Sequence, residues 1–136
     1  MSEGKSQLHL KVVTPTRVAV DAEVDEVTLP GAVGALGILP GHTPLLTSLR
    51  IGELSYRKGM REHFLAIQWG FGEIANDQVT VLAEVAELPE EIDVEAARAE
   101  KKAAEEALRT AAGKEFDHQR AHLEAAVTRI AVAARR

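Results

Sequence analysis

Residues 8–24 read LHLKVVTPTRVAVDAEV, and apolar and polar side chains alternate along most of this stretch. Alternation places successive side chains on opposite faces of an extended chain, so the pattern predicts half-buried strands. Thr14 and Pro15 interrupt the pattern at a place where a tight turn is needed. The stretch therefore predicts two strands joined by a turn.

The alternating pattern continues to about Val85, and turn-forming pairs separate the apolar runs. Pro30-Gly31 is one such pair, while Lys58-Gly59 and Asn76-Asp77 are typical of hairpin tips. Several short strands without a long helical pattern among them favour an antiparallel sandwich or barrel. We therefore expect an N-terminal antiparallel β-sandwich in residues 1–87, with a largely aliphatic core.

The pattern changes after Glu84 to an Ala-rich, charged one with a three-to-four spacing. Residues 88–91 indicate a linker, and Asp93 is placed to cap a helix. Gly113 divides two helical stretches, which predicts an antiparallel two-helix hairpin in residues 88–136. The predicted facing stripes are Val94, Ala97, Ala104, Leu108 and Ala111 in the first helix, and Phe116, Leu123, Val127, Ile130 and Ala134 in the second.

Composition excludes several classes of function. A net charge of −5 argues against a nucleic-acid binder, which needs a basic face. The absence of cysteine excludes a disulfide framework and Cys-based zinc or redox chemistry. No segment approaches the roughly 20 apolar residues of a membrane span, and the first ten residues lack a signal-peptide run. We expect a soluble, cytosol-facing chain.

Two nucleotide-binding motifs are only apparent. Gly4-Lys5-Ser6 ends like a phosphate-binding P-loop, but the required earlier glycine and preceding strand are missing. Gly70-x-Gly72-x-x-Ala75 resembles a dinucleotide fingerprint, yet an alternating strand follows where a helix must begin. These glycines instead indicate close strand packing.

His118 and His122 have the spacing of a zinc-protease pair on one helix face. The residue between them that would serve as general base is Gln119, and an amide cannot accept a proton from zinc-bound water. A surface pair with weak adventitious metal affinity is favoured, and we expect no metal site. No nucleophile motif or paired acid completes an active site, so we expect no catalytic residues and no cofactor.

The segment Pro30–Leu46 is rich in Gly and Pro but also carries Val33, Leu36, Ile38 and Leu39. This composition predicts a rigid loop that displays apolar groups to a partner. Its core, GILPGHTPL at residues 37–45, together with Val13-Thr14-Pro15 and Gly70-Phe71, resembles the epsilon subunit of F-type ATP synthases. The resemblance covers essentially the whole chain, including the order of β domain and Ala-rich hairpin.

The resemblance implies a non-catalytic subunit of the central stalk, or rotor, which links the gamma subunit to the c-ring and couples proton flow to ATP synthesis. It implies a peripheral position on the cytoplasmic face of a bacterial inner membrane. The residues implied at the gamma subunit are His42 and Thr43, and those implied at the c-ring are Gly31, Ala32, Val33, Gly34, Ala35 and Leu36. Many relatives carry acids at the positions of Val33 and Ala35, so an apolar or backbone contact is expected here.

The resemblance also implies a brake on ATP hydrolysis, in which the second helix extends toward acidic segments of the catalytic head. Arg120, Arg129, Arg135 and Arg136 are available for such contacts. Some relatives bind ATP through an Ile/Leu-Asp-x-x-Arg-Ala motif, where this chain reads IDVEAARA at residues 92–99. The displacement of Arg98 by two positions is about 200° of helix rotation, so Asp93 and Arg98 should not grip one ligand. We expect weak or absent ATP binding.

Two alternatives remain open from the residues alone. One is a stand-alone β-domain adaptor that uses the helices as a coiled-coil docking arm, and its self-association without a synthase would favour it. The other is a small metalloenzyme centred on His118 and His122. Stoichiometric zinc that is lost on changing His122→Ala would be needed to support it.

Overall fold

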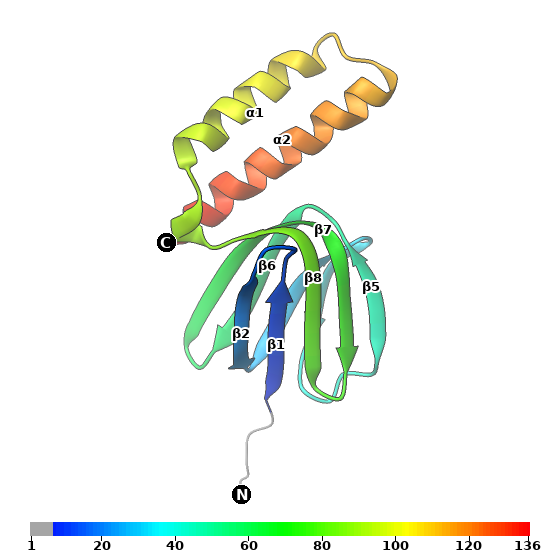
Figure 1. Cartoon of the computed structure of the whole chain (residues 1–136), viewed down its shortest axis with the longest axis vertical. Helices are drawn as coiled ribbons and strands as arrows, with labels where there is room; N and C mark the ends of the chain where they lie inside the picture. Colours follow the sequence, from blue (N-terminus) through cyan, green and yellow to red (C-terminus); the bar gives the residue numbers. More distant parts are fainter. Residues whose placement is uncertain (1–6) are drawn as a thin grey trace, which may run out of the picture.

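The computed structural model describes residues 7–136, which form a β-sandwich with a helical hairpin at one end (Figure 1). The Gly4-Lys5-Ser6 segment lies outside these residues. The strands are β1 (Leu8–Val13), β2 (Val18–Val24), β3 (Glu26–Gly31), β4 (Gly34–Ile38), β5 (Leu45–Leu49), β6 (Gly52–Lys58), β7 (Arg61–Ala75) and β8 (Gln78–Glu87). A short 3-10 helix η1 (Pro89–Glu91) leads to α1 (Val94–Leu108) and α2 (Gly113–Ala133). The predicted order of sandwich and hairpin is confirmed.

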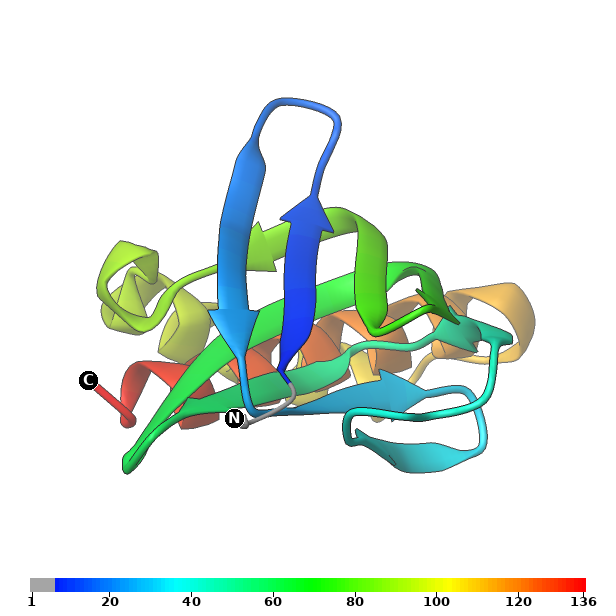
Figure 2. The same ribbon diagram turned by 90° about the horizontal axis from the view of Figure 1, so that it is seen from below.

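The strands follow the order β2-β1-β8-β7-β5-β3-β4, and β6 pairs with both β3 and β7. Figure 2 shows β1 and β2 crossing the strands of the other layer at a steep angle. All pairs are antiparallel except β1 with β8, which run parallel from His9↔Gln78 to Val13↔Leu82. This one pair departs from the predicted arrangement. Parallel pairing is possible there because β1 and β8 are joined only through the whole intervening domain.

The long strand β7 changes partner at its middle. Its first half pairs with β6 up to Gly52↔Ile67, and its second half pairs with β5 from Leu49↔Gly70. Trp69 stands between these pairings with a left-handed backbone (φ 53°), which is rare for a bulky residue. The strained residue therefore marks the bend at which the sheet turns from one layer toward the other.

Aliphatic side chains from both layers form one core. Leu8, Leu10 and Val12 of β1 are fully buried, as the alternation predicts, and Val79 and Val81 of the adjacent strand β8 are buried beside them. Leu29, Leu54, Leu65 and Ile67 complete its centre. Since this cluster draws only on strand residues and Leu88, the sandwich is stabilised without the hairpin.

The Pro30–Leu46 segment contains a β-strand and is not a loop throughout. Residues 34–38 form β4, which pairs with β3 from Val27↔Ile38 to Gly31↔Gly34. Val33 and Leu39 are exposed as expected, but Ile38 is fully buried in the core. The expectation that Ile38 is displayed was wrong, because pairing with β3 directs its side chain inward.

The helices form the predicted antiparallel pair. Asp93 caps α1 by accepting a hydrogen bond from the Ala96 amide at 3.0 Å, as predicted, and Gly113 adopts φ 59° where α2 begins. The predicted stripe of α1 is supported by burial of Ala97 and Ala104. The stripe of α2 is partly wrong: its buried residues are Ala126, Val132 and Ala133, whereas Phe116 and Val127 are exposed. The last turns of α2 pack on the sandwich as well as on α1. The buried residues therefore lie on a different side of the helix from the predicted stripe.

His9 on β1 lies between two carboxylates of β2. Its Nε2 is 2.6 Å from Asp21 Oδ1, and its Nδ1 is 2.8 Å from Glu23 Oε2. Hydrogen bonding to Glu23, and then to Asp21, raises the pKa of His9 above its ordinary value. The contact is fully present while the imidazole is protonated.

Stability should therefore depend on pH through His9. A raised folded-state pKa contributes stability below the unfolded pKa of about 6.5, and this contribution is lost as pH rises through the folded pKa. We expect the free energy of unfolding to fall over that window in the native chain and less so in His9→Gln. Urea unfolding at several pH values measures the difference, and identical pH slopes in the two proteins would contradict it.

Candidate functional site

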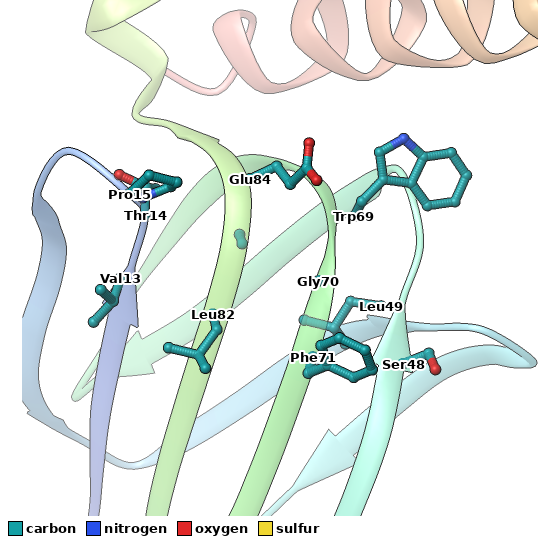
Figure 3. A pocket seen from close by; sticks show the side chains of 11 residues that line it. Val13, Thr14, Pro15, Ser48, Leu49, Trp69, Gly70, Phe71, Leu82 and Glu84 are labelled. Atoms are coloured by element: carbon teal, nitrogen blue, oxygen red, sulfur yellow. The ribbon is translucent and has the colours of Figure 1, made fainter.

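An apolar row crosses the outer face of one sheet layer on neighbouring strands. It consists of Val13, Leu82 and Phe71, which are paired in register as Val13↔Leu82 and Phe71↔Leu82. Ser48 of β5 continues the row as the partner of Phe71. Figure 3 shows these side chains side by side, with Trp69 and Glu84 above them on the side of the hairpin. Sheet register thus gathers residues that are far apart in the chain.

The row is exposed although it is apolar. Phe71 and Leu82 are 55% and 53% exposed. Leu46 on β5, which is not part of the row, is 70% exposed. The row lines a shallow hollow of about 610 Å³ that also borders Pro15, Trp69 and Glu84. Contiguous exposed apolar surface of this kind indicates an interaction site. Trp69, half exposed at the edge of the hollow, is a residue type enriched among interface anchors.

Sequence reasoning did not find this row. A signal was present, because Leu82 is out of phase with the buried Val79, Val81 and Ala83 of the same strand. An apolar residue at an outward position of an alternating strand is unexplained by the core. Phe71 carries the same signal between Gly70 and Gly72. Only the register, however, shows that Val13 joins them.

The residues expected at the c-ring, Gly31–Leu36, form the β3–β4 turn and its flanks. The Ala32 amide donates to the Ser48 carbonyl at 3.0 Å, so the turn is held against β5. Val33 at its tip is fully exposed, and Ala32, Gly34 and Ala35 are exposed as well. Leu36 is partly buried against the core. The turn presents backbone and small apolar groups.

His42 and Thr43 lie in the connection between β4 and β5, outside the residues that line the hollow. The His42 Nδ1 is 2.6 Å from the Thr43 carbonyl oxygen. The neighbouring Gly41 amide donates to Asp77 Oδ1 at 2.7 Å, which ties this connection to the β7–β8 turn. The segment is therefore fastened to the β7–β8 turn by a hydrogen bond from a backbone amide to a side-chain carboxylate.

Three of the four arginines expected to act on a partner are already engaged within the chain. Arg129 contacts Glu87 and Glu100, Arg135 contacts Glu53, and Arg136 donates to backbone carbonyls. Arg120 makes no ion pair or side-chain hydrogen bond within residues 7–136. The hairpin as folded here leaves only Arg120 of the four free.

The short helix η1, which leads into the hairpin, is held to the sandwich by Arg17. Arg17, after the β1–β2 turn, binds both carboxylate oxygens of Glu91 at 2.5 and 2.7 Å and the Ala86 carbonyl at 2.9 Å. Hydrogen bonding to Arg17 lowers the pKa of Glu91. Arg17 thus joins η1 to the β1–β2 turn and to the end of β8.

Two protein-family models match consecutive parts of the chain. The β-sandwich domain of the ATP synthase delta/epsilon chain matches residues 7–89. The long α-helix domain of the same chain matches residues 90–134. This chain belongs to the ATP synthase delta/epsilon family. The resemblance that the 37–45 stretch indicated is confirmed.

Curated members of the delta/epsilon family are similar over nearly their full length. The ATP synthase epsilon chain 2 of Syntrophotalea carbinolica is 48% identical over 131 residues, covering 95% of each chain. The ATP synthase epsilon chain of Geotalea daltonii is 49% identical over 130 residues, covering 93% of this chain and 94% of that one.

Solved structures show the same fold. A chain in the Euglena gracilis mitochondrial ATP synthase assembly of OSCP, F1 and c-ring superposes with a TM-score of 0.82 at 21% identity, covering 99% of this chain and 86% of that one. A chain of the central stalk and c-ring of the Tetrahymena thermophila enzyme gives a TM-score of 0.60 at 16% identity, covering 96% of each.

In this delta/epsilon chain, Asp93 and Arg98 have separate partners, whereas His118 and His122 are neighbours on α2. Asp93 caps α1, whereas Arg98 pairs with Glu95 at 3.1 Å. The Nε2 atoms of His118 and His122 are 3.1 Å apart on the exposed surface of α2. Within residues 7–136, no group of three or more His, Cys, Asp or Glu side chains is arranged to hold a metal, and no helix is long and apolar enough to cross a membrane.

Proposed function

We propose that this chain is the non-catalytic epsilon subunit of an F-type ATP synthase rotor, which links the gamma subunit to the c-ring. The observation that carries the proposal is the exposed apolar row of Val13, Leu82 and Phe71 on a chain of the delta/epsilon family. Such a row is suited to a permanent partner rather than to a substrate, because it lacks convergent polar groups. Residues 1–87 form the rotor-binding unit.

We assign the gamma subunit to the apolar row, with His42 and Thr43 as further contacts. The hollow over the row accepts apolar side chains, and Trp69 at its margin adds an aromatic anchor. The c-ring is assigned to Gly31–Leu36. Because Val33 and Ala35 are uncharged and exposed, that contact is apolar or made through the backbone.

Residues 88–136 act as a regulatory element in this proposal, inhibiting ATP hydrolysis when α2 extends toward the catalytic head. Arg120, Arg129, Arg135 and Arg136 would then meet acidic groups of that head. The subunit is peripheral, on the cytoplasmic face of a bacterial inner membrane. Catalysis resides in other chains of the complex.

The proposal is tested by assembly. Purified chain mixed with the gamma subunit is expected to co-elute as a stable complex, and the pair is expected to bind c-ring in detergent. A synthase that lacks this chain should couple proton flow to ATP synthesis poorly, and adding the chain should restore coupling. Failure to bind gamma, or full coupling without the chain, would contradict the proposal.

Nucleotide is not expected to regulate this hairpin through Asp93 and Arg98. The carboxylate of Asp93 already accepts the helix-capping bond, and Arg98 is paired with Glu95 on the exposed side of α1. We expect millimolar ATP to produce no measurable heat on titration and no protection of α1 amides. Saturable binding that is lost in Arg98→Ala would contradict this.

A further inference from the structure

The hairpin contacts the sandwich through the last turns of α2. Val132 and Ala133 are buried there in a small cluster with Ala66 and Ile92, with Phe64 and Val94 packed against it. Closer to the start of α2, a gap of about 390 Å³ separates Trp69 of the sandwich from residues 117–124 of the helix. Figure 1 shows the hairpin lying obliquely over the sandwich from this contact. Apart from an ion pair of Arg50 with Glu124 at 4.0 Å, the attachment is therefore concentrated at one end.

Arg129 lies at the centre of this attachment. Its Nε and Nη2 donate to the two carboxylate oxygens of Glu87, at the end of β8, at 2.8 and 3.2 Å. Its Nη1 donates to Glu100 of α1 at 2.8 Å. One side chain thus joins the sandwich and both helices.

The Arg129–Glu87 pair is the more enclosed of these contacts. The two side chains are 15% and 22% exposed, whereas Glu100 is 58% exposed. Burial by itself lowers the pKa of Arg129, but hydrogen bonding and charge attraction from Glu87 and Glu100 raise it overall. A fork-shaped guanidinium–carboxylate pair is specific in geometry, and solvent screens it less than it screens a surface pair.

The chain terminus adds two further contacts. Arg135 lies 4.3 Å over the centre of the Phe64 ring and binds Glu53 of β6 at 3.2 Å. Arg136 donates to the carbonyls of Pro89 and Ile92 at 3.1 and 2.8 Å. These contacts continue the attachment to the end of the chain.

We propose that Arg129 and Glu87 form an ionic lock that holds the hairpin on the sandwich, and that breaking this one pair releases the hairpin as a unit. The apolar part of the attachment is small and includes two alanines, so it contributes little burial. Removing Arg129 leaves the enclosed Glu87 without its ion-pair partner, and removing Glu87 leaves Arg129 with only the exposed Glu100, so either change costs more than losing a surface pair. The lock therefore shifts the equilibrium between the docked and the released hairpin toward the docked form.

The lock also decides which arginines a partner can reach. While Arg129, Arg135 and Arg136 bind Glu87, Glu53 and backbone carbonyls, they cannot bind acidic groups elsewhere. An acidic segment of a partner must compete with Glu87 for Arg129. This consequence for inhibition rests on the proposed function, whereas the lock itself concerns the isolated chain.

Hydrogen exchange of the isolated full chain tests the lock. A released Ala-rich hairpin is only marginally stable, so its amides exchange when it opens. In Glu87→Gln, we expect exchange in α1 and α2 to accelerate about 10- to 100-fold, the range for loss of a charge-assisted hydrogen bond. Exchange in β1 and β5 should stay unchanged, because these strands belong to the separate sandwich core.

Glu84→Gln is the matched control. Glu84 is on the same strand and exposed, and it makes no ion pair within residues 7–136. Arg129→Gln should accelerate exchange at least as much as Glu87→Gln, and the double variant no more than Arg129→Gln alone. Unchanged exchange in Glu87→Gln, equal acceleration in Glu84→Gln, or additive effects in the double variant would overturn the lock.

ATP hydrolysis by assembled synthase distinguishes a failure of the lock from a failure of the proposed function. If the released hairpin inhibits, ATP hydrolysis by synthase that contains Glu87→Gln should be lower than by synthase with Glu73→Gln, which changes an exposed residue of β7 outside the hollow. Accelerated exchange with unchanged hydrolysis would support the lock and contradict the inhibitory role of the hairpin.

Discussion

Gly70→Ala is expected to destabilise the sandwich by more than about 3 kcal/mol, enough to unfold many small domains. A Cβ atom at residue 70 would lie 2.0 Å from the Leu82 carbonyl oxygen and 2.9 Å from the Ala83 Cα. Both are backbone atoms of the paired strand β8, so relief requires separation of two central strands. The φ of 156° adds strain for any residue with a Cβ.

Urea unfolding followed by circular dichroism measures this effect. Gly37→Ala is the matched control, because Gly37 is also in a strand but a Cβ there meets nothing within 4 Å. We expect the control to stay within about 0.5 kcal/mol of the native chain. Equal stability of the two alanine variants would show that β7 and β8 can separate at low cost and would contradict the prediction.

Phe71→Glu is expected to weaken binding to the gamma subunit by about 100-fold or more. Phe71 occupies the middle of the apolar row and is 55% exposed, so the substitution should leave the fold intact. Once the partner covers the row, the new carboxylate would be buried without a counter-charge, and the aromatic contact would be lost.

The affinity of each variant for purified gamma subunit can be measured by calorimetry. Met60→Glu is a suitable control, since it also replaces an apolar side chain by a carboxylate, and Met60 is fully exposed in the β6–β7 turn, outside the residues that line the hollow. We expect less than about a threefold change in the control. Unchanged affinity in Phe71→Glu would remove the row as the gamma-binding surface, although the chain would still belong to its family.

Local features of the fold were predictable because they depend on neighbours in sequence. Asn76 and Asp77 both adopt the left-handed backbone of a tight hairpin turn, as the pair indicated. Asp93 caps α1 for an equally local reason. The direction of β1 against β8 was not predictable, because that pairing joins the two ends of the domain and no short connection constrains it.

The candidate site was less predictable than the fold. Leu82 carried a signal as an apolar residue at an outward position, but Val13 and Phe71 become its neighbours only through strand register. The buried stripe of α2 was also predicted wrongly. Periodicity indicates that the helix has an apolar face, but it does not show that the helix packs on both α1 and the sandwich. Arg129 appeared as one basic residue among several until the structure placed it beside Glu87.

The alternating strands that begin with LHLKVV, the turn residues and the Ala-rich repeat determined by themselves that this chain is a sandwich followed by a hairpin. Backbone period and turn chemistry act over a few residues, so one sequence suffices to define them. Tertiary structure alone decided which exposed apolar residues form one row and which arginine joins three elements. Both depend on side chains brought together from distant positions, where register and packing, rather than local preference, set the distance.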